Sequence, residues 1–400
     1  MGGTRKPAAS IDQPHPSEQL DVLRENLNLD KNEWQQFLRH ARNGFVDYTR
    51  SAFIHQDTAL RLRDVPDSWW EEPEPVGYVF LRVAQQANAD LTARVAWFFL
   101  QMYDPEVDYH RVPPGTGLAW LHLSRQGIDP AVPPAELTRQ ALVGPEHFFQ
   151  GINEDEDLLP ACRLILEGAG TIQAWDVHAV IAAVDYARIH VRAPFRLFNG
   201  LMAADWITVD VKREFCRGLL GCDPEGKQLR EHRALLKARM DADAQVFFRC
   251  LKAWQGLTDS GIGDHLPTLR RHAVFALVET VGEPLLGVVD EFFLKNYGAA
   301  AATEAVSEGV LDLIGLHADK LGPELVRNLI GKAIKRGLAS VRQAAYRIGA
   351  EQFGLAFVRP ALKDDAGIVR KWAARLLETK KLQPARKTVP RSQSRSSPAS

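Results

Sequence analysis

The sequence contains little cysteine. Its 400 residues include only Cys162, Cys216, Cys222 and Cys250, and none of them forms a CxxC pair. No histidine pair stands near Cys216 and Cys222 at the spacing of a zinc site. We therefore predict neither a disulfide nor structural zinc. The four thiols are interpreted as small buried hydrophobic groups in a reducing compartment.

The sequence also lacks a long apolar run. No stretch approaches the roughly 18 uninterrupted apolar residues that are needed to span a bilayer. The first residues contain no apolar segment of the kind that a signal peptide requires. Lys6 occupies the position where N-myristoylation requires serine or threonine. These absences predict a cytoplasmic protein that does not associate with membranes.

Motifs of catalytic and nucleotide-binding sites are absent as well: there is no phosphate loop, GxSxG, HExxH or dinucleotide fingerprint. The most suggestive polar cluster is Asp176, His178 and Asp185. His178 and Asp185 would lie about 10 Å apart along a helix, so we interpret these groups as buried, with local partners. The acidic run 154–157 is interpreted as a helix start rather than a calcium loop. We predict no catalytic residue, no cofactor and no metal ligand, which argues against an enzyme.

What the sequence does contain is helical periodicity over most of its length. One predicted helix is apolar on every side, which is expected of a buried central helix. Two further helices form a predicted pair joined at 88–90, with Asp90 as the N-cap of the second. The principal predicted helices are 78–87, 91–103, 173–190 and 227–254.

A few segments depart from this periodicity. The segment 69–75 contains closely spaced prolines and is predicted to be a loop. The runs 189–192 and 206–211 alternate apolar and polar residues, which indicates helix ends or, alternatively, a small sheet. Tryptophans at helical positions, such as Trp97, are expected to pack in the core.

A repeated pattern dominates the C-terminal third. Each block places an aliphatic residue before an arginine, with small or apolar residues four and seven positions after the aliphatic one, which puts them on one helix face. A glycine then follows, as a left-handed C-cap requires, and a second helix begins. Val306, Val310 and Leu313 form a weaker copy that Gly322 closes. The aligned residues are Leu269-Arg270, Ala273, Ala276 and Gly282; Val341-Arg342, Ala345, Ile348 and Gly354; and Val369-Arg370, Ala373 and Leu376.

The segment Asp365–Ala373, with Val369-Arg370 at its centre, resembles the first helix of HEAT and HEAT-like repeats. The resemblance covers residues from about 265 to 382. It implies that the arginine bonds an acidic residue or carbonyl groups of a neighbouring repeat, and Asp365 is a plausible partner of Arg370, whereas Arg342 lacks a nearby acid. The segment Leu91–Ala96 is a fainter echo of the motif.

The expected fold class is all-α, an α-solenoid of antiparallel helix pairs with a less regular N-terminal helical half, because a lone pair cannot bury its apolar face. Residues 1–18 are predicted to form a disordered leader and 19–260 a helical domain, either less regular or built of divergent repeats. Residues 261–382 are predicted to hold the HEAT-like repeats and 383–400 a disordered basic tail.

Positive charge is concentrated near the C-terminus. From Val326 onward there are 17 lysines and arginines against four acidic residues, a balance of +13, so the preceding 325 residues carry −14 within the net charge of −1. This segregation predicts a surface for an anionic partner, or a solvated outer face, or pairing between copies of the chain. The candidate binding residues are Lys332, Arg336, Arg342, Arg347, Arg370 and Lys371.

The leading hypothesis is a non-enzymatic scaffold that binds another protein. The alternative is a nucleic-acid-binding α-solenoid that resembles the HEAT-repeat DNA glycosylases, although no aromatic and carboxylate pair of the glycosylase kind can be assigned here. HEAT-like lyases that handle tetrapyrroles are a more remote resemblance. The fold by itself does not choose among these classes.

Overall fold

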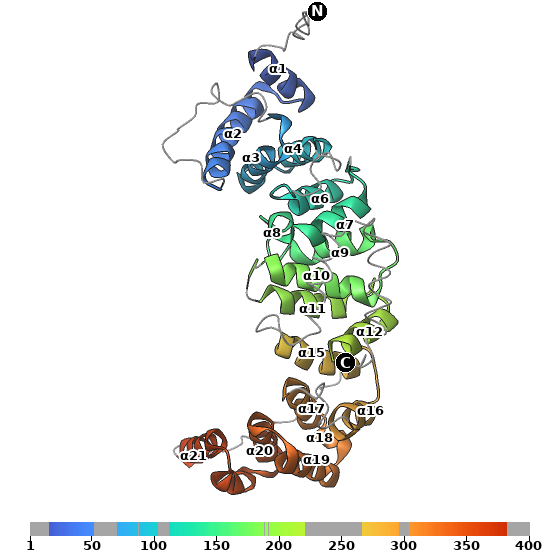
Figure 1. The fold of residues 1–400 in the computed structure, drawn as a ribbon, viewed down its shortest axis with the longest axis vertical. Coiled ribbons are helices and arrows are strands. Elements are labelled where there is room, and N and C mark those ends of the chain that lie inside the picture. The colour runs from blue at the N-terminus through green and yellow to red at the C-terminus, as the bar shows by residue number, and fades with distance from the viewer. Residues whose placement is uncertain are drawn as a thin grey trace, which may run out of the picture. The chain divides into compact units, whose positions relative to one another are not determined.

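The structure is a computed structural model and describes residues 16–51, 70–86, 88–102, 112–130, 132–187, 189–190, 192–220, 266–295 and 304–381. Every regular element within these ranges is a helix, so the predicted all-α class is confirmed (Figure 1). The chain divides into two compact units, Met1–Leu269 and Arg270–Ser400. The predicted helix 227–254, the predicted boundary at 260–261 and the predicted tail 383–400 lie outside the described residues.

The helices of the first unit follow one another closely along the chain. Most pack against the next helix or the one after it: α2 against α3, α3 against α4, α4 against α6, α7 against α9, and α10 against both α11 and α12. The bounds are α1 (Pro16–Asn26), α2 (Lys31–Ser51), α3 (Pro73–Gln86), α4 (Ala89–Gln101), α6 (Thr116–Arg125), α7 (Pro134–Val143), α8 (Pro145–Phe148), α9 (Leu158–Gly168), α10 (Ala174–Ala187), α11 (Ala193–Ala203) and α12 (Val209–Leu219).

Two local predictions in this unit were wrong. The segment 69–75 is only partly a loop, because α3 begins at Pro73 and contains Pro75 in its first turn. The first turn tolerates proline, since its N–H groups have no partner within the helix. The N-cap of α4 is Asn88 rather than Asp90: the Asn88 side chain accepts a hydrogen bond of 2.7 Å from the N–H of Leu91.

Helix α10 is the central element that its composition predicted, with one exception. Val177, Ile181 and Val184 are fully buried, whereas Tyr186 is 65% exposed. The two alternating runs contain no strand in their described residues, and the second leads into α12 at Val209. A helix end is therefore the correct interpretation of 206–211.

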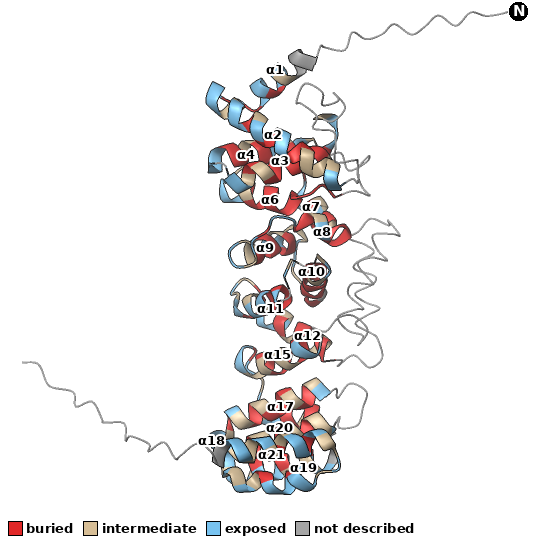
Figure 2. Ribbon diagram, turned by 90° about the vertical axis from the view of Figure 1, so that its left-hand side faces the viewer, coloured by how far each residue is buried: buried red, intermediate tan, exposed pale blue. Residues whose placement is uncertain are grey.

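In the second unit, α15 (Leu266–Glu279), which straddles the boundary between the units, is followed by paired helices. Helix α20 packs against α17, α19 and η4, and η4 packs against α21. In Figure 2 buried and exposed stretches alternate along these helices, as expected of amphipathic helices that share a core. The remaining bounds are α16 (Leu285–Val289), the π-helix η3 (Asp290–Lys295), α17 (Glu304–Leu316), α18 (Ala318–Leu321), α19 (Pro323–Arg336), α20 (Ala339–Phe353), the 3₁₀-helix η4 (Leu355–Lys363) and α21 (Gly367–Lys381).

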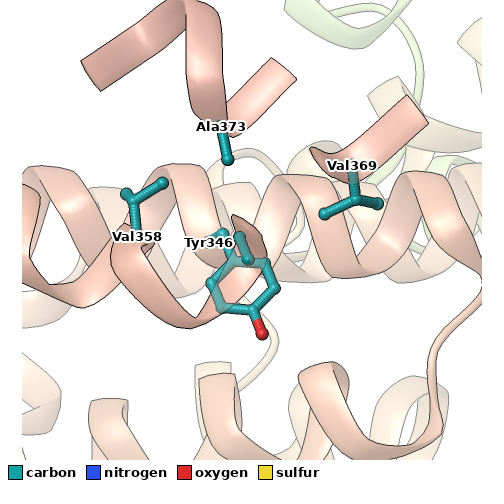
Figure 3. Packing of buried hydrophobic residues seen from close by; sticks show 5 residues of the cluster. Tyr346, Val358, Val369 and Ala373 are labelled. Carbon is teal, nitrogen blue, oxygen red and sulfur yellow. The ribbon is translucent and has the colours of Figure 1, made fainter. Parts of the chain in front are cut away.

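The repeated apolar positions all point inward. Leu269, Val341 and Val369, which precede the arginines, are at most 2% exposed, and the alanines four residues later are fully buried. Val369 and Ala373 belong to one core cluster with Tyr346 and Val358, which come from α20 and η4 (Figure 3). The predicted inward face of these helices is confirmed.

The helix ends differ in detail from the prediction. Gly322 and Gly354 have positive φ values of 78° and 84°, as predicted, but their ψ values of 151° and 168° place them in an extended region that only glycine reaches easily. Moreover, η4 is a 3₁₀-helix and contains Pro360. A 3₁₀-helix has three residues per turn, so Val358 and Ala361 lie on the same face, and both are fully buried. Asp364, three residues after Ala361, immediately follows the helix.

Phe80 tests the core of the first unit. Its ring is fully buried and stacks on Phe99 of α4 with centroids 5.9 Å apart. We expect Phe80→Ala to lower the free energy of unfolding by about 3 to 5 kcal/mol, because it removes apolar contacts and leaves a cavity. Urea unfolding followed by circular dichroism measures the change. Tyr186→Ala is the control, expected within about 0.5 kcal/mol of the unmodified chain; equal losses would contradict the assignment of this core.

Candidate partner-binding surface

Arg342 of α20 connects two inter-helix loops. Its guanidinium donates to both carboxylate oxygens of Asp364, from Nε over 2.9 Å and from the second terminal nitrogen over 2.7 Å. The first terminal nitrogen donates to the carbonyl of Gly337 over 2.8 Å. The loop before α20 and the loop before α21 are thereby held by a single side chain. The sequence provided no partner for Arg342, because Asp364 lies 22 residues away and only the packing of η4 brings it close.

Arg370 performs a related task at the start of α21. Its guanidinium donates to the carbonyl of Asp364 over 2.5 Å and to that of Asp365 over 2.8 Å. Asp365 is thus a partner of Arg370, as expected, through its carbonyl oxygen. Carbonyl groups in this loop have no partner within a helix, so a nearby arginine satisfies them.

The same arrangement recurs in the first unit. Arg94 of α4 donates to the carbonyls of Leu27 and Asn28, over 3.3 and 2.5 Å, in the loop that joins α1 to α2. It also pairs with Glu33 over 2.5 Å and with Asp90 over 2.9 Å. Arg94 belongs to the segment that faintly echoes the repeat motif, and its guanidinium binds loop carbonyls as those of Arg342 and Arg370 do.

A second ion-pair cluster joins three helices of the second unit. Asp312 of α17 receives a hydrogen bond from Arg347 of α20 over 2.5 Å and pairs with Arg271 of α15. The Asp312 side chain is 13% exposed, so this carboxylate lies largely within the protein. Arg347, predicted as a partner-binding residue, therefore neutralises an acid of its own unit.

The electrostatics of the loop pair follow from its geometry. Hydrogen bonds from Arg342 lower the pKa of the Asp364 carboxyl, and the N–H of Ala366 lowers it further. The carboxylate in turn raises the pKa of Arg342. The Asp364 side chain is 5% exposed and that of Arg342 is 20% exposed. Burial at this level makes the loss of either partner costly, because the other charge would remain without compensation.

The six predicted cations thus do not form one uniform anion site. Arg342, Arg347 and Arg370 bind groups of their own unit, as described above. Lys332 and Lys371 are exposed and form no ion pair with a described residue. The side chain of Arg336 lies outside the described residues.

Exposed aliphatic residues were missed by sequence reasoning. Leu338 is 63% exposed, Leu362 43% and Ile368 63%, and all three lie in or beside the loops that Arg342 connects. Leu316, also 63% exposed, lies at the end of α17. Ile368 immediately precedes the buried Val369, so it lies off the buried face of its helix. This position is the one sequence feature that could have identified Ile368 as exposed.

Other polar groups are accounted for by structural roles. Asp176 is 4% exposed and accepts a hydrogen bond of 2.8 Å from the N–H of Gln173, as predicted for a local partner. The acidic run before α9 also forms ion pairs, Asp157 with Arg125 and Glu154 with Arg196. No group of three potential metal ligands occurs among the described residues. Trp97, expected in the core, is 36% exposed.

No family model, no curated protein and no solved structure matches this chain. Its function must therefore be inferred from contacts and exposed side chains. No helix in the described ranges has both the length and the apolar character needed to cross a membrane. Cys162 and Cys216 are buried free thiols, while Cys222 and Cys250 lie outside the described residues.

Asp364→Asn tests the loop connection. The substitution removes the charge that Arg342 binds, and we expect the opening free energy of α20 and η4 to fall by about 2 kcal/mol, the scale of hydrogen bonds to a charged group. Native-state hydrogen exchange at neutral pH measures this value for peptides that cover the two helices. Asp365→Asn is the matched control. The Asp365 carboxylate is next to Asp364 in the sequence and is exposed, and it accepts no hydrogen bond from a described residue.

The same variant should change the response to acid. Because the pKa of Asp364 is lower in the folded state, its stabilisation is complete above the unfolded pKa of about 3.9 and is lost as pH falls through the lower folded value. Asp364→Asn should therefore flatten the decline in protection below about pH 4, whereas Asp365→Asn should retain it. An unchanged acid response in Asp364→Asn would show that the pair does not contribute to stability.

Proposed function

We propose that the chain is a non-enzymatic scaffold, a HEAT-like α-solenoid whose successive helix pairs present an edge to a protein partner. The proposal is supported by the recurrence of one contact: an arginine near the start of a helix that binds the carbonyls of an inter-helix loop. Arg94, Arg342 and Arg370 all form it. The contact matches the role that the resemblance assigns to the motif arginine.

The observation that carries the interaction function is the exposure of large aliphatic side chains in or beside the loops that Arg342 and Arg370 bind. Leu338 and Ile368 are each 63% exposed, although alanines beside them pack into the core. Clustered exposed apolar residues beside polar ones are typical of protein interaction sites. A partner would cover them without any rearrangement of the fold.

The charge layout favours protein over nucleic acid as the partner. Two of the six predicted cations, Arg342 and Arg347, pair with carboxylates of their own unit, which leaves fewer charges available for phosphate groups. Arg327 packs over the ring of Phe353, with its guanidinium carbon 4.6 Å from the centroid. The nucleic-acid alternative rests on exposed cations that form no ion pair with a described residue, among them Lys332, Arg359, Lys363, Lys371 and Arg375. Free buried thiols at Cys162 and Cys216 support a reducing, cytoplasmic location.

Site-specific photo-crosslinking tests the scaffold function. A benzophenone amino acid placed singly at Leu338, Ile368, Leu316, Tyr186 or Trp97, all of them exposed, should form a discrete protein adduct from at least one position in cells that produce the chain. Nuclease treatment should leave the adduct unchanged. Adducts that disappear with nuclease, or an absence of protein adducts at every position, would overturn the proposal.

A salt titration of random duplex DNA binding tests the alternative. Phosphate contacts release counterions, so a nucleic-acid-binding protein would show affinity that falls steeply as salt rises. We expect no measurable binding of DNA to the full chain at physiological salt. The matched variant pair is Lys332→Glu and Asp365→Lys, which change surface charge in opposite directions. Tight binding that Lys332→Glu weakens and Asp365→Lys strengthens would favour the nucleic-acid function instead.

A further inference from the structure

The two loops that Arg342 connects lie close to each other in the second unit. One guanidinium contacts both the Gly337 carbonyl and the Asp364 carboxylate, so the two loops lie within one side chain's reach of each other. Arg370 holds the carbonyls of Asp364 and Asp365. Ala339 and Ala366, one in each loop region, pack against the same core cluster. Exposed residues of this region also include Asp365 and Arg370; we call five of the exposed residues, Leu338, Leu362, Lys363, Ile368 and Lys371, the 338–368 edge.

Three of its five side chains are large and aliphatic. Leu338, Leu362 and Ile368 are 63%, 43% and 63% exposed. Burial of such side chains favours binding in proportion to the apolar area removed from water, so a partner that covered all three would gain affinity. The hydrogen bonds of Arg342 and Arg370 hold the loops in place, which reduces the ordering cost of binding.

The charge of the 338–368 edge is positive. Lys363 and Lys371 are exposed and form no ion pair with a described residue. The carboxylate of Asp364 is 5% exposed and already bound by Arg342, so Asp365 is the only acid of these loops whose charge reaches solvent uncompensated. Ammonium groups beside aliphatic side chains complement carboxylates beside aliphatic side chains.

Nucleic acid fits this edge less well. Phosphate groups would use the two lysines but leave three aliphatic side chains in water, and unpaired bases bind preferentially to aromatic rings. The nearest aromatic residue, Trp372, is partly buried against the core cluster. An acidic peptide with leucine-like anchors satisfies both the charge and the apolar area.

We propose that the 338–368 edge binds an acidic peptide segment of the partner, with aliphatic anchors on Leu338, Leu362 and Ile368 and carboxylates on Lys363 and Lys371. This assignment rests on the proposed scaffold function and specifies its binding site. The anchors supply affinity, and the lysines supply orientation and preference for acidic sequence.

Fluorescence anisotropy tests the assignment with the full chain. The probe is a labelled synthetic peptide in which leucines recur at helical spacing among glutamates, and the same peptide with lysine in place of glutamate should not bind. We expect Leu338→Asp and Ile368→Asp each to weaken binding of the acidic peptide at least about tenfold. Lys363→Glu should weaken it too, with a smaller effect at high salt.

Leu316→Asp provides a matched control. Leu316 is as exposed as Leu338, but it follows Gly315, whose carbonyl accepts a hydrogen bond from Gln352 near the C-terminal end of α20. Leu338 precedes the N-terminal end of that helix, about 20 Å away at 1.5 Å per residue. The control should change the affinity less than about twofold, and circular dichroism should show all variants equally folded.

The outcomes separate this assignment from the scaffold function. Equal weakening by Leu316→Asp and Leu338→Asp, or no binding of the acidic peptide, would overturn the assignment to this edge. Protein crosslinks at Leu316, Tyr186 or Trp97 alone would do the same and would leave the scaffold function intact. An absence of protein crosslinks at every position would remove the scaffold function itself.

Discussion

A single pair of helices cannot bury its apolar faces, and the structure of the second unit follows from this constraint. Leu269, Val341 and Val369 lie on helices that would each expose a hydrophobic stripe if isolated, yet all three are at most 2% exposed. Helix α20 is covered by α17, α19 and η4, and η4 is covered in turn by α21. Each helix therefore depends on its neighbours for the other half of its core.

Packing of this kind leaves polar groups at the helix ends, and arginines satisfy them. Arg342 and Arg370 bind carbonyls and a carboxylate in the loops before α20 and α21, and Arg94 binds the loop between α1 and α2. An arginine suits this position because its planar guanidinium offers several donors in fixed directions. Of these side chains, Arg342 is paired with the Asp364 carboxylate, whereas Arg370 is exposed and binds neutral carbonyl groups.

The charge segregation of the sequence thus acquires a different meaning in the folded chain. Arg347 forms an ion pair with Asp312, and Arg342 forms one with Asp364. Lysines such as Lys363 and Lys371 are exposed to solvent instead. Positive charge at the 338–368 edge therefore comes from flexible ammonium groups beside exposed aliphatic side chains. A mixed surface of this composition favours an acidic protein segment over a nucleic-acid backbone.

The sequence alone determined the helical class, the inward face of the repeated helices and the glycines at their ends, because periodicity and backbone freedom are local properties. It also placed Asp176 correctly as a buried group with a local partner. Only the tertiary structure decided that Asp364 binds Arg342 and that η4 is a 3₁₀-helix, since both depend on how segments distant in sequence pack together. The exposure of Leu338 and Ile368 was also decided by the tertiary structure. Whether an aliphatic side chain is buried depends on which neighbouring elements pack against it, and the residue type alone does not determine those neighbours.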